Sequence, residues 1–87
     1  MAPTVDEVAT MMAAQYEAGG GILYQNETAE RIVTEFGGAF LKGEKGHWSI
    51  DRRVRESFRT LAGNPVWRVH RGVGYWERRP DSAAEDV

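Results

Sequence analysis

The sequence predicts an α+β fold with three helices, one short strand and a C-terminal β-hairpin, in the order helix, strand, helix, helix, strand, strand. Two observations support this class. Apolar residues recur at helical spacing in three segments separated by glycines, and an alternating run fills residues 66–78. With 87 residues, the chain is expected to form a single domain over residues 1–80. The small, acidic residues 81–87 are expected to be a disordered tail.

The first helix is predicted to begin after Thr4, because residues 4–7 (TVDE) have the pattern of a capping box. In this motif the threonine hydroxyl accepts from the third helical amide, and the glutamate reaches back to the threonine amide. The apolar face of the helix is expected to comprise Val5, Val8, Ala9, Met11, Met12 and Tyr16. Three glycines at 19–21 end the helix, since glycine tolerates the left-handed cap.

A short β-favouring run, ILYQ at 22–25, precedes the second helix. Asn26 is expected to be the N-cap of that helix, with Glu27 near its positive end. Its apolar face is expected to comprise Ala29, Ile32, Val33 and Phe36. Gly37 and Gly38 end it.

The segment 39–50 contains the turn signal GEKG and predicts a small extra hairpin at 40–49. Either Ser49 or Asp51 is expected to cap the third helix. The apolar side of that helix is expected to comprise Ile50, Val54, Phe58 and Leu61, and residues 63–65 (GNP) end it.

The alternating run VWRVHRGVGYWER at 66–78 predicts a β-hairpin that turns around residues 72–74. Trp67, Val69 and Trp76 are expected to face inward. All three tryptophans, including Trp48, are interpreted as core residues that fill the space between the hairpin and the helices.

In this order of elements the chain resembles the winged-helix family. The segments that carry the resemblance are ILYQNETAERIVTEF, SIDRRVRESFRTL and VWRVHRGVGYWER, and it covers about residues 4–79. The chain also resembles small uncharacterised bacterial and phage single-domain proteins with an I-D-x-x-V…F helix and a tryptophan-containing hairpin. The winged-helix resemblance implies that the third helix lies in the major groove of DNA, while the hairpin, or wing, touches the backbone or minor groove. Residues 37–50 depart from the family, in which only a few residues join these two helices.

Charge is distributed unevenly along the chain. Residues 1–40 hold one basic and six acidic residues, residues 41–80 hold ten basic and four acidic, and residues 81–87 hold three acidic. The net charge of −2 therefore hides a basic second half of the domain. This asymmetry indicates an anionic partner.

Arg52, Arg55 and Arg59 fall within about 60° of one another on a helical wheel and lie away from the apolar side. The guanidinium fork of arginine suits both phosphate and the O6/N7 edge of guanine. The residues expected to bind duplex DNA are Arg52, Arg55, Arg59, Arg68, Arg71 and Arg78. Six phosphate contacts would give a slope of about −5 in log affinity against log salt.

Two other interpretations remain open. The arginine side could be the solvated face of a core helix, because Glu56 is spaced to pair with Arg52 and Arg59. The alternative function is a protein–protein interaction or assembly module that uses the acidic first helix or exposed aromatics and binds no nucleic acid. A homodimer through the first helix, with Met11 exposed, is a further hypothesis.

No enzymatic activity, metal or cofactor is expected. His47 and His70 are the only histidines and the chain has no cysteine, so a zinc site lacks ligands. Ser49, Asp51 and His47 lie too close along one segment to form a triad. The absence of cysteine and of a signal peptide indicates a cytoplasmic protein, and no apolar run approaches the ~20 residues that span a membrane.

Overall fold

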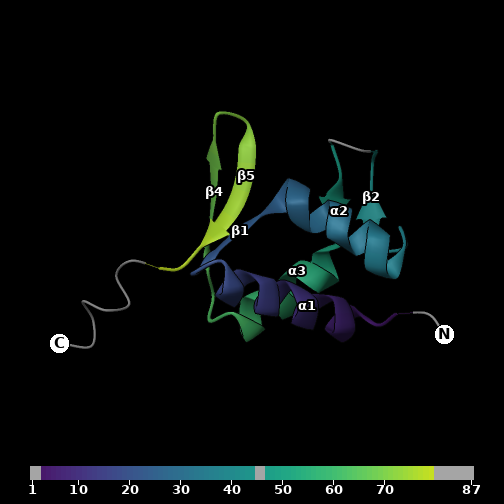
Figure 1. Cartoon of the computed structure of the whole chain (residues 1–87), viewed down its shortest axis with the longest axis horizontal. Coiled ribbons are helices and arrows are strands. Elements are labelled where there is room, and N and C mark those ends of the chain that lie inside the picture. The colour runs from purple at the N-terminus through teal and green to yellow at the C-terminus, as the bar shows by residue number, and fades with distance from the viewer. Residues whose placement is uncertain (1–2, 45–46, 80–87) are drawn as a thin grey trace.

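A computed structural model gives the structure of the chain and describes residues 3–44 and 47–79 (Figure 1). The elements are α1 (Val5–Ala18), β1 (Ile22–Tyr24), α2 (Gln25–Phe36), β2 (Leu41–Lys42), β3 (Ser49–Ile50), α3 (Arg52–Leu61), β4 (Val66–His70) and β5 (Val73–Glu77). This is the predicted α+β fold, and β2 and β3 form the extra hairpin expected at 40–49. The tail expected at 81–87, and the centre of the turn between β2 and β3, lie outside the described residues.

The predicted capping box begins α1. The Thr4 hydroxyl accepts from the backbone amide of Glu7 at 3.1 Å, and the Glu7 carboxylate accepts from the Thr4 amide at 2.8 Å. The capping box thus pairs two of the backbone amides that the start of a helix leaves without an intrahelical partner. The buried residues of the helix are Val8, Ala9, Met12 and Tyr16. Val5 and Met11 are half-buried against this core.

The prediction that Asn26 caps α2 is wrong. The extended backbone of β1 runs directly into the helix, so Tyr24 is the N-cap and Asn26 already lies in the first turn. No side chain caps this end, but the Thr28 hydroxyl donates to the Tyr24 carbonyl at 2.7 Å. Thr28 is buried together with Ala29 and Ile32, so this bond satisfies its buried hydroxyl, while Val33 is exposed.

Three strands form an antiparallel sheet in the order β1–β5–β4. Trp76, in the central strand, pairs with Leu23 on one side and Trp67 on the other. Because side chains alternate across a strand, these three residues share the face toward the helices. Arg68 and Tyr75, one position along, share the outer face.

The turn of the β4–β5 hairpin is formed by Arg71 and Gly72, one residue before the position expected from the sequence. His70 pairs with Val73, which leaves a two-residue loop with φ values of +53° and +79°. Two positive φ angles define the type I′ turn, whose twist matches that of the flanking strands. The hairpin stands away from the helices in Figure 1, which explains why Val69, although it faces inward, is 63% exposed.

The core is organised around Phe58 of α3. Its ring lies edge-on to Tyr16 at 5.7 Å between centroids and to Trp76 at 5.2 Å. α3 packs mainly against α1, and Figure 1 shows both helices beside the base of the sheet. Leu61 is 53% exposed, so its predicted place on the apolar side is wrong; it is the last residue of α3.

Replacing Phe58 by alanine should therefore lower the free energy of unfolding by about 3–5 kcal/mol. The change would leave a cavity between α1, α3 and the sheet, and urea denaturation followed by circular dichroism measures the loss. Leu61→Ala, in the same helix but exposed, is the matched control and should cost less than about 1 kcal/mol. Equal losses in the two variants would contradict this account of the core.

Candidate nucleic-acid interface

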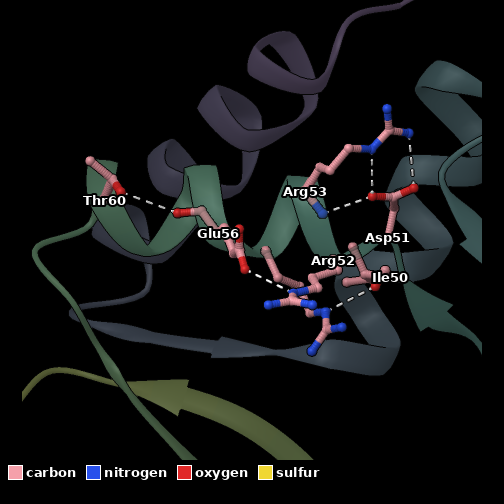
Figure 2. A network of polar contacts seen from close by, with 7 residues as sticks. Ile50, Asp51, Arg52, Arg53, Glu56 and Thr60 are labelled. Atoms are coloured by element: carbon pink, nitrogen blue, oxygen red, sulfur yellow. Dashed lines mark hydrogen bonds and ion pairs between the residues drawn. The ribbon is translucent and has the colours of Figure 1, made fainter.

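Asp51 fixes the N-terminus of α3. Of the two predicted caps, Ser49 lies in β3, whereas the Asp51 carboxylate accepts from the backbone amide of Arg53 at 2.8 Å. The same carboxylate forms a two-point ion pair with the Arg53 guanidinium, at 3.2 and 3.1 Å. Figure 2 shows Arg53 and Asp51 on one side of α3, and Arg52 with Glu56 on the other.

The ion pair shifts the titration of both partners. The hydrogen bonds from the Arg53 side chain and then from its backbone amide lower the pKa of Asp51 below its usual value. The same contact raises the pKa of Arg53. The positive charge of Arg53 is thus matched locally, and Arg53 does not belong with the other arginines of α3.

Those other arginines line an open groove of about 550 Å³ between α3 and the base of the β4–β5 hairpin. We call it the arginine groove, and its charged residues are Arg52, Arg55, Glu56, Arg59 and Arg79. Four arginines and one glutamate give it a formal charge of +3. The three α3 arginines predicted from the sequence are thus brought together, as the helical wheel indicated.

Hydrogen bonds hold these arginines in place. Arg52 pairs with Glu56 at 2.9 Å, and Arg55 donates to the Ile50 carbonyl at 3.0 Å. Arg59 donates to the side-chain oxygen of Asn64 at 2.9 Å, and not to Glu56, the partner that helical spacing also allows. Only Arg52 meets a carboxylate, so three of the four cations keep an uncompensated charge among the described residues.

Besides the polar side chain of Gln25 in α2, the rest of the groove wall is apolar and comes from the hairpin and the chain before it. This apolar part comprises Pro65, Val66, Trp67 and Trp76. Trp76 is almost fully buried, but Trp67 is 44% exposed, so the assignment of all three tryptophans to the core is wrong for Trp67. Trp48 is half-buried, and its carbonyl accepts from the Gln25 side chain. The groove therefore combines guanidinium groups with one accessible indole.

The three remaining predicted site residues lie elsewhere. Arg68 is on the outer sheet face and forms an ion pair with Glu77. Arg78 follows β5 in the chain and lies against the C-terminal end of α1. There it pairs with Glu17 at 2.8 Å, and its guanidinium lies 5.8 Å from the centre of the Tyr16 ring. Contact with Tyr16, and then with Glu17, raises the pKa of Arg78. Arg71 occupies the hairpin tip and has no ion-pair partner within residues 3–44 and 47–79.

Arg79 was missed from the sequence as a site residue. Its guanidinium donates to the Asn64 carbonyl at 2.8 Å, which ties the end of β5 to the turn after α3. Nothing local predicts this, because the two residues are brought together only when the hairpin folds back. Arg59 bonds the side chain of the same asparagine, so Asn64 aligns cations from two distant segments.

The described part of the long segment between α2 and α3 does not line the groove. Its β2–β3 hairpin is attached to α3 through the Asp51 amide, which donates to the Phe40 carbonyl at 2.8 Å. No described residue between Gly37 and Ser49 lines the groove. Within the described residues, this segment thus leaves the arginine side of α3 open.

The acidic residues of α1 are already engaged. Glu7 closes the capping box and Glu17 pairs with Arg78. Among the described residues, no group of three His, Cys, Asp or Glu side chains could hold a metal ion. In the same part of the chain, no helix has the length and apolar character to cross a bilayer.

Substituting Asp51 tests how the arginine helix is anchored. Asp51→Ala should lower the free energy of unfolding by about 1 kcal/mol at pH 7, because the first turn of α3 loses its cap. The pKa of Asp51 is lowered in the folded state. The charge of Asp51 therefore makes its full contribution to the free energy of unfolding above the unfolded pKa of about 3.9. This contribution is lost as the pH falls through the folded pKa. Urea denaturation between pH 7 and pH 3 should show the difference from wild type shrinking. Asp51→Asn is the control, because asparagine keeps the cap without the charge. If the stability lost in Asp51→Ala did not change with pH, the assignment of Asp51 as the charged cap of α3 would be refuted.

Comparison with known proteins places the chain in a family without assigning it a role. No curated protein matches it significantly, and no solved structure does. A family profile matches residues 4–78, which span all eight elements of the fold and all but one of the residues of the arginine groove. The chain therefore belongs to DUF6953, a family of unknown function.

Proposed function

We propose that this protein is a variant winged-helix domain that binds duplex DNA through the arginine groove and the tip of the β4–β5 hairpin. The observation that carries the proposal is the convergence of Arg52, Arg55, Arg59 and Arg79 on one open groove. Arginine clusters of this kind neutralise backbone phosphates and supply the sequence-independent part of DNA affinity.

The arrangement of the elements supports the winged-helix part of the proposal. A third helix beside a three-stranded sheet of order β1–β5–β4 presents one helix face and one projecting hairpin in the same region. In such a domain the helix enters the major groove while the hairpin reaches the neighbouring backbone. The residues proposed for DNA contact are Arg52, Arg55, Arg59, Arg71 and Arg79. Arg68 and Arg78 are left out, because each is paired with a carboxylate away from the groove.

Arg71 supports the role of the hairpin tip. It has a φ of +53°, a region that disfavours residues with a β-carbon, by roughly 1–2 kcal/mol in the left-handed helical conformation. Asparagine or glycine is the usual residue at this position of a type I′ turn. Backbone strain of this kind is concentrated at functional sites, and here it places a cation at the outermost point of the hairpin.

The outer sheet face favours a second candidate function, the protein-interaction module. Ile22, Tyr24 and Val73 are each about 40% exposed on that face, beside Tyr75. The rings of Tyr24 and Tyr75 lie 5.5 Å apart and form a small aromatic surface. We favour this second function only if the protein binds no DNA.

Removing two groove charges should weaken DNA binding, whereas removing two charges elsewhere should not. Arg52→Gln/Arg59→Gln is expected to lower affinity for a labelled 20-base-pair duplex by about tenfold or more at low salt. The wild-type slope of log affinity against log salt should be about −4.5 for five contacts, and the variant slope should be shallower by about 2. Fluorescence anisotropy at 50 to 200 mM salt measures both quantities.

Arg68→Gln/Arg78→Gln is the matched control, because it removes the same charge from outside the groove. It should bind like wild type. Equal loss in the two double variants would show that only net charge matters, and no salt-dependent binding by the wild type would end the DNA proposal.

Replacing Arg71 by asparagine should separate stability from binding. Asparagine adopts the positive φ of this turn position more readily than arginine, so the free energy of unfolding should rise by about 0.5–1 kcal/mol. DNA affinity should fall severalfold at low salt, since one phosphate contact is lost. Denaturation and anisotropy on the same sample measure the two effects, and unchanged affinity would remove the hairpin tip from the interface.

A further inference from the structure

Trp67 is an exposed aromatic residue that the core holds in a fixed position. A continuous series of ring contacts leads to it from the centre of the domain. Phe58 touches Trp76 at 5.2 Å between ring centroids, and Trp76 touches Trp67 at 4.7 Å. Phe58 and Trp76 are buried, so the ring of Trp67 packs against the core.

Gly74 completes this support. It lies in β5 diagonally opposite Trp67, and a β-carbon there would overlap the six-membered ring of the indole. Only glycine at this position lets the ring lie against the strand. The indole thus packs against β5 and Trp76, is 44% exposed and lines the groove, as a stacking surface for a ligand would.

The position of Trp67 beside the arginines indicates which kind of ligand this surface suits. It shares the groove with Arg52, Arg55, Arg59 and Arg79. The volume of about 550 Å³ lies within the range of roughly 300–1,000 Å³ found for sites that enclose organic ligands, so the groove offers more room than a backbone phosphate needs. A flat apolar surface beside several guanidinium groups suits a ligand that is both planar and anionic.

We propose that the arginine groove binds an unpaired nucleotide of a DNA strand, with its base stacked on Trp67 and its phosphates held by the arginines. This inference rests on the proposed DNA-binding function and specifies its preferred ligand. In a duplex each base offers only its edge in the grooves, whereas stacking on an indole requires the open face of a base. The preferred ligand is therefore a duplex with a single-stranded overhang, with little preference for base identity.

The test compares two overhangs that carry the same phosphates. A labelled 20-base-pair duplex bears either a five-nucleotide thymidine overhang or a five-nucleotide abasic overhang, and anisotropy titrations give the two affinities. The wild type should bind the thymidine overhang about tenfold more tightly, the scale of one base stacked on an aromatic ring. Trp67→Leu should reduce this ratio to near one and leave the affinity for the abasic overhang almost unchanged.

Tyr24→Leu is the matched control, because Tyr24 is similarly exposed, at 41%, but lies on the outer face of the sheet. It should keep the wild-type ratio. Thermal unfolding checks that each variant folds. If Trp67→Leu does not fold, Trp67→Phe decides through a second signal, since a thymidine pentanucleotide should quench the tryptophan fluorescence of wild type much more than that of Trp67→Phe.

The outcomes separate the two proposals. A wild-type ratio near one, with clear binding of both overhangs, overturns the unpaired-nucleotide inference and leaves duplex binding intact. A tenfold ratio that persists in Trp67→Leu overturns the role of Trp67. Equal competition by a glutamate pentapeptide shows an unselective anion site and also overturns the inference. No binding of either overhang or of a blunt duplex overturns the proposed function, and this inference with it.

Discussion

The contact between Phe58 and Trp76 is the constraint on which the rest of the structure depends. Phe58 reaches α1 through Tyr16, and Trp76 reaches both edge strands through its pairing with Leu23 and Trp67. One aromatic pair therefore joins two helices to all three strands of the main sheet. In a domain of this size few other contacts can do so, because a small fold buries a modest fraction of its surface.

This core also determines where the charges go. Burial of Val54 and Phe58 sets the rotation of α3, so Arg52, Arg55 and Arg59 are turned toward the hairpin while Arg53 lies on the opposite side with Asp51 (Figure 2). The inward position of Trp76 places Arg68 on the outer face, where Glu77 pairs with it. The cationic groove thus results from packing, since an amphipathic helix alone would present its arginines without a facing wall.

The same packing supports the side chains that line the groove. Asn64 accepts hydrogen bonds from both Arg59 of α3 and Arg79 after β5. Its φ of +62° belongs to the turn after α3 that brings Asn64 between these two arginines. Trp67 is supported by Gly74 and Trp76. A site whose cations and indole are held before a ligand arrives loses less conformational entropy on binding. The hairpin tip differs, because Arg71 stores backbone strain there.

Local patterns in the sequence determined the three helices, the two hairpins, the capping box of α1 and the grouping of the α3 arginines. Each depends on residues a few positions apart, so spacing alone was sufficient. Tertiary structure decided the rest. It excluded Arg68 and Arg78 from the groove, added Arg79 to it and left Trp67 exposed. The reason is that strand register and the return of the hairpin onto α3 bring together residues that are far apart in the chain. Such long-range pairings leave no periodic signal, and only the folded backbone shows which charges share a face.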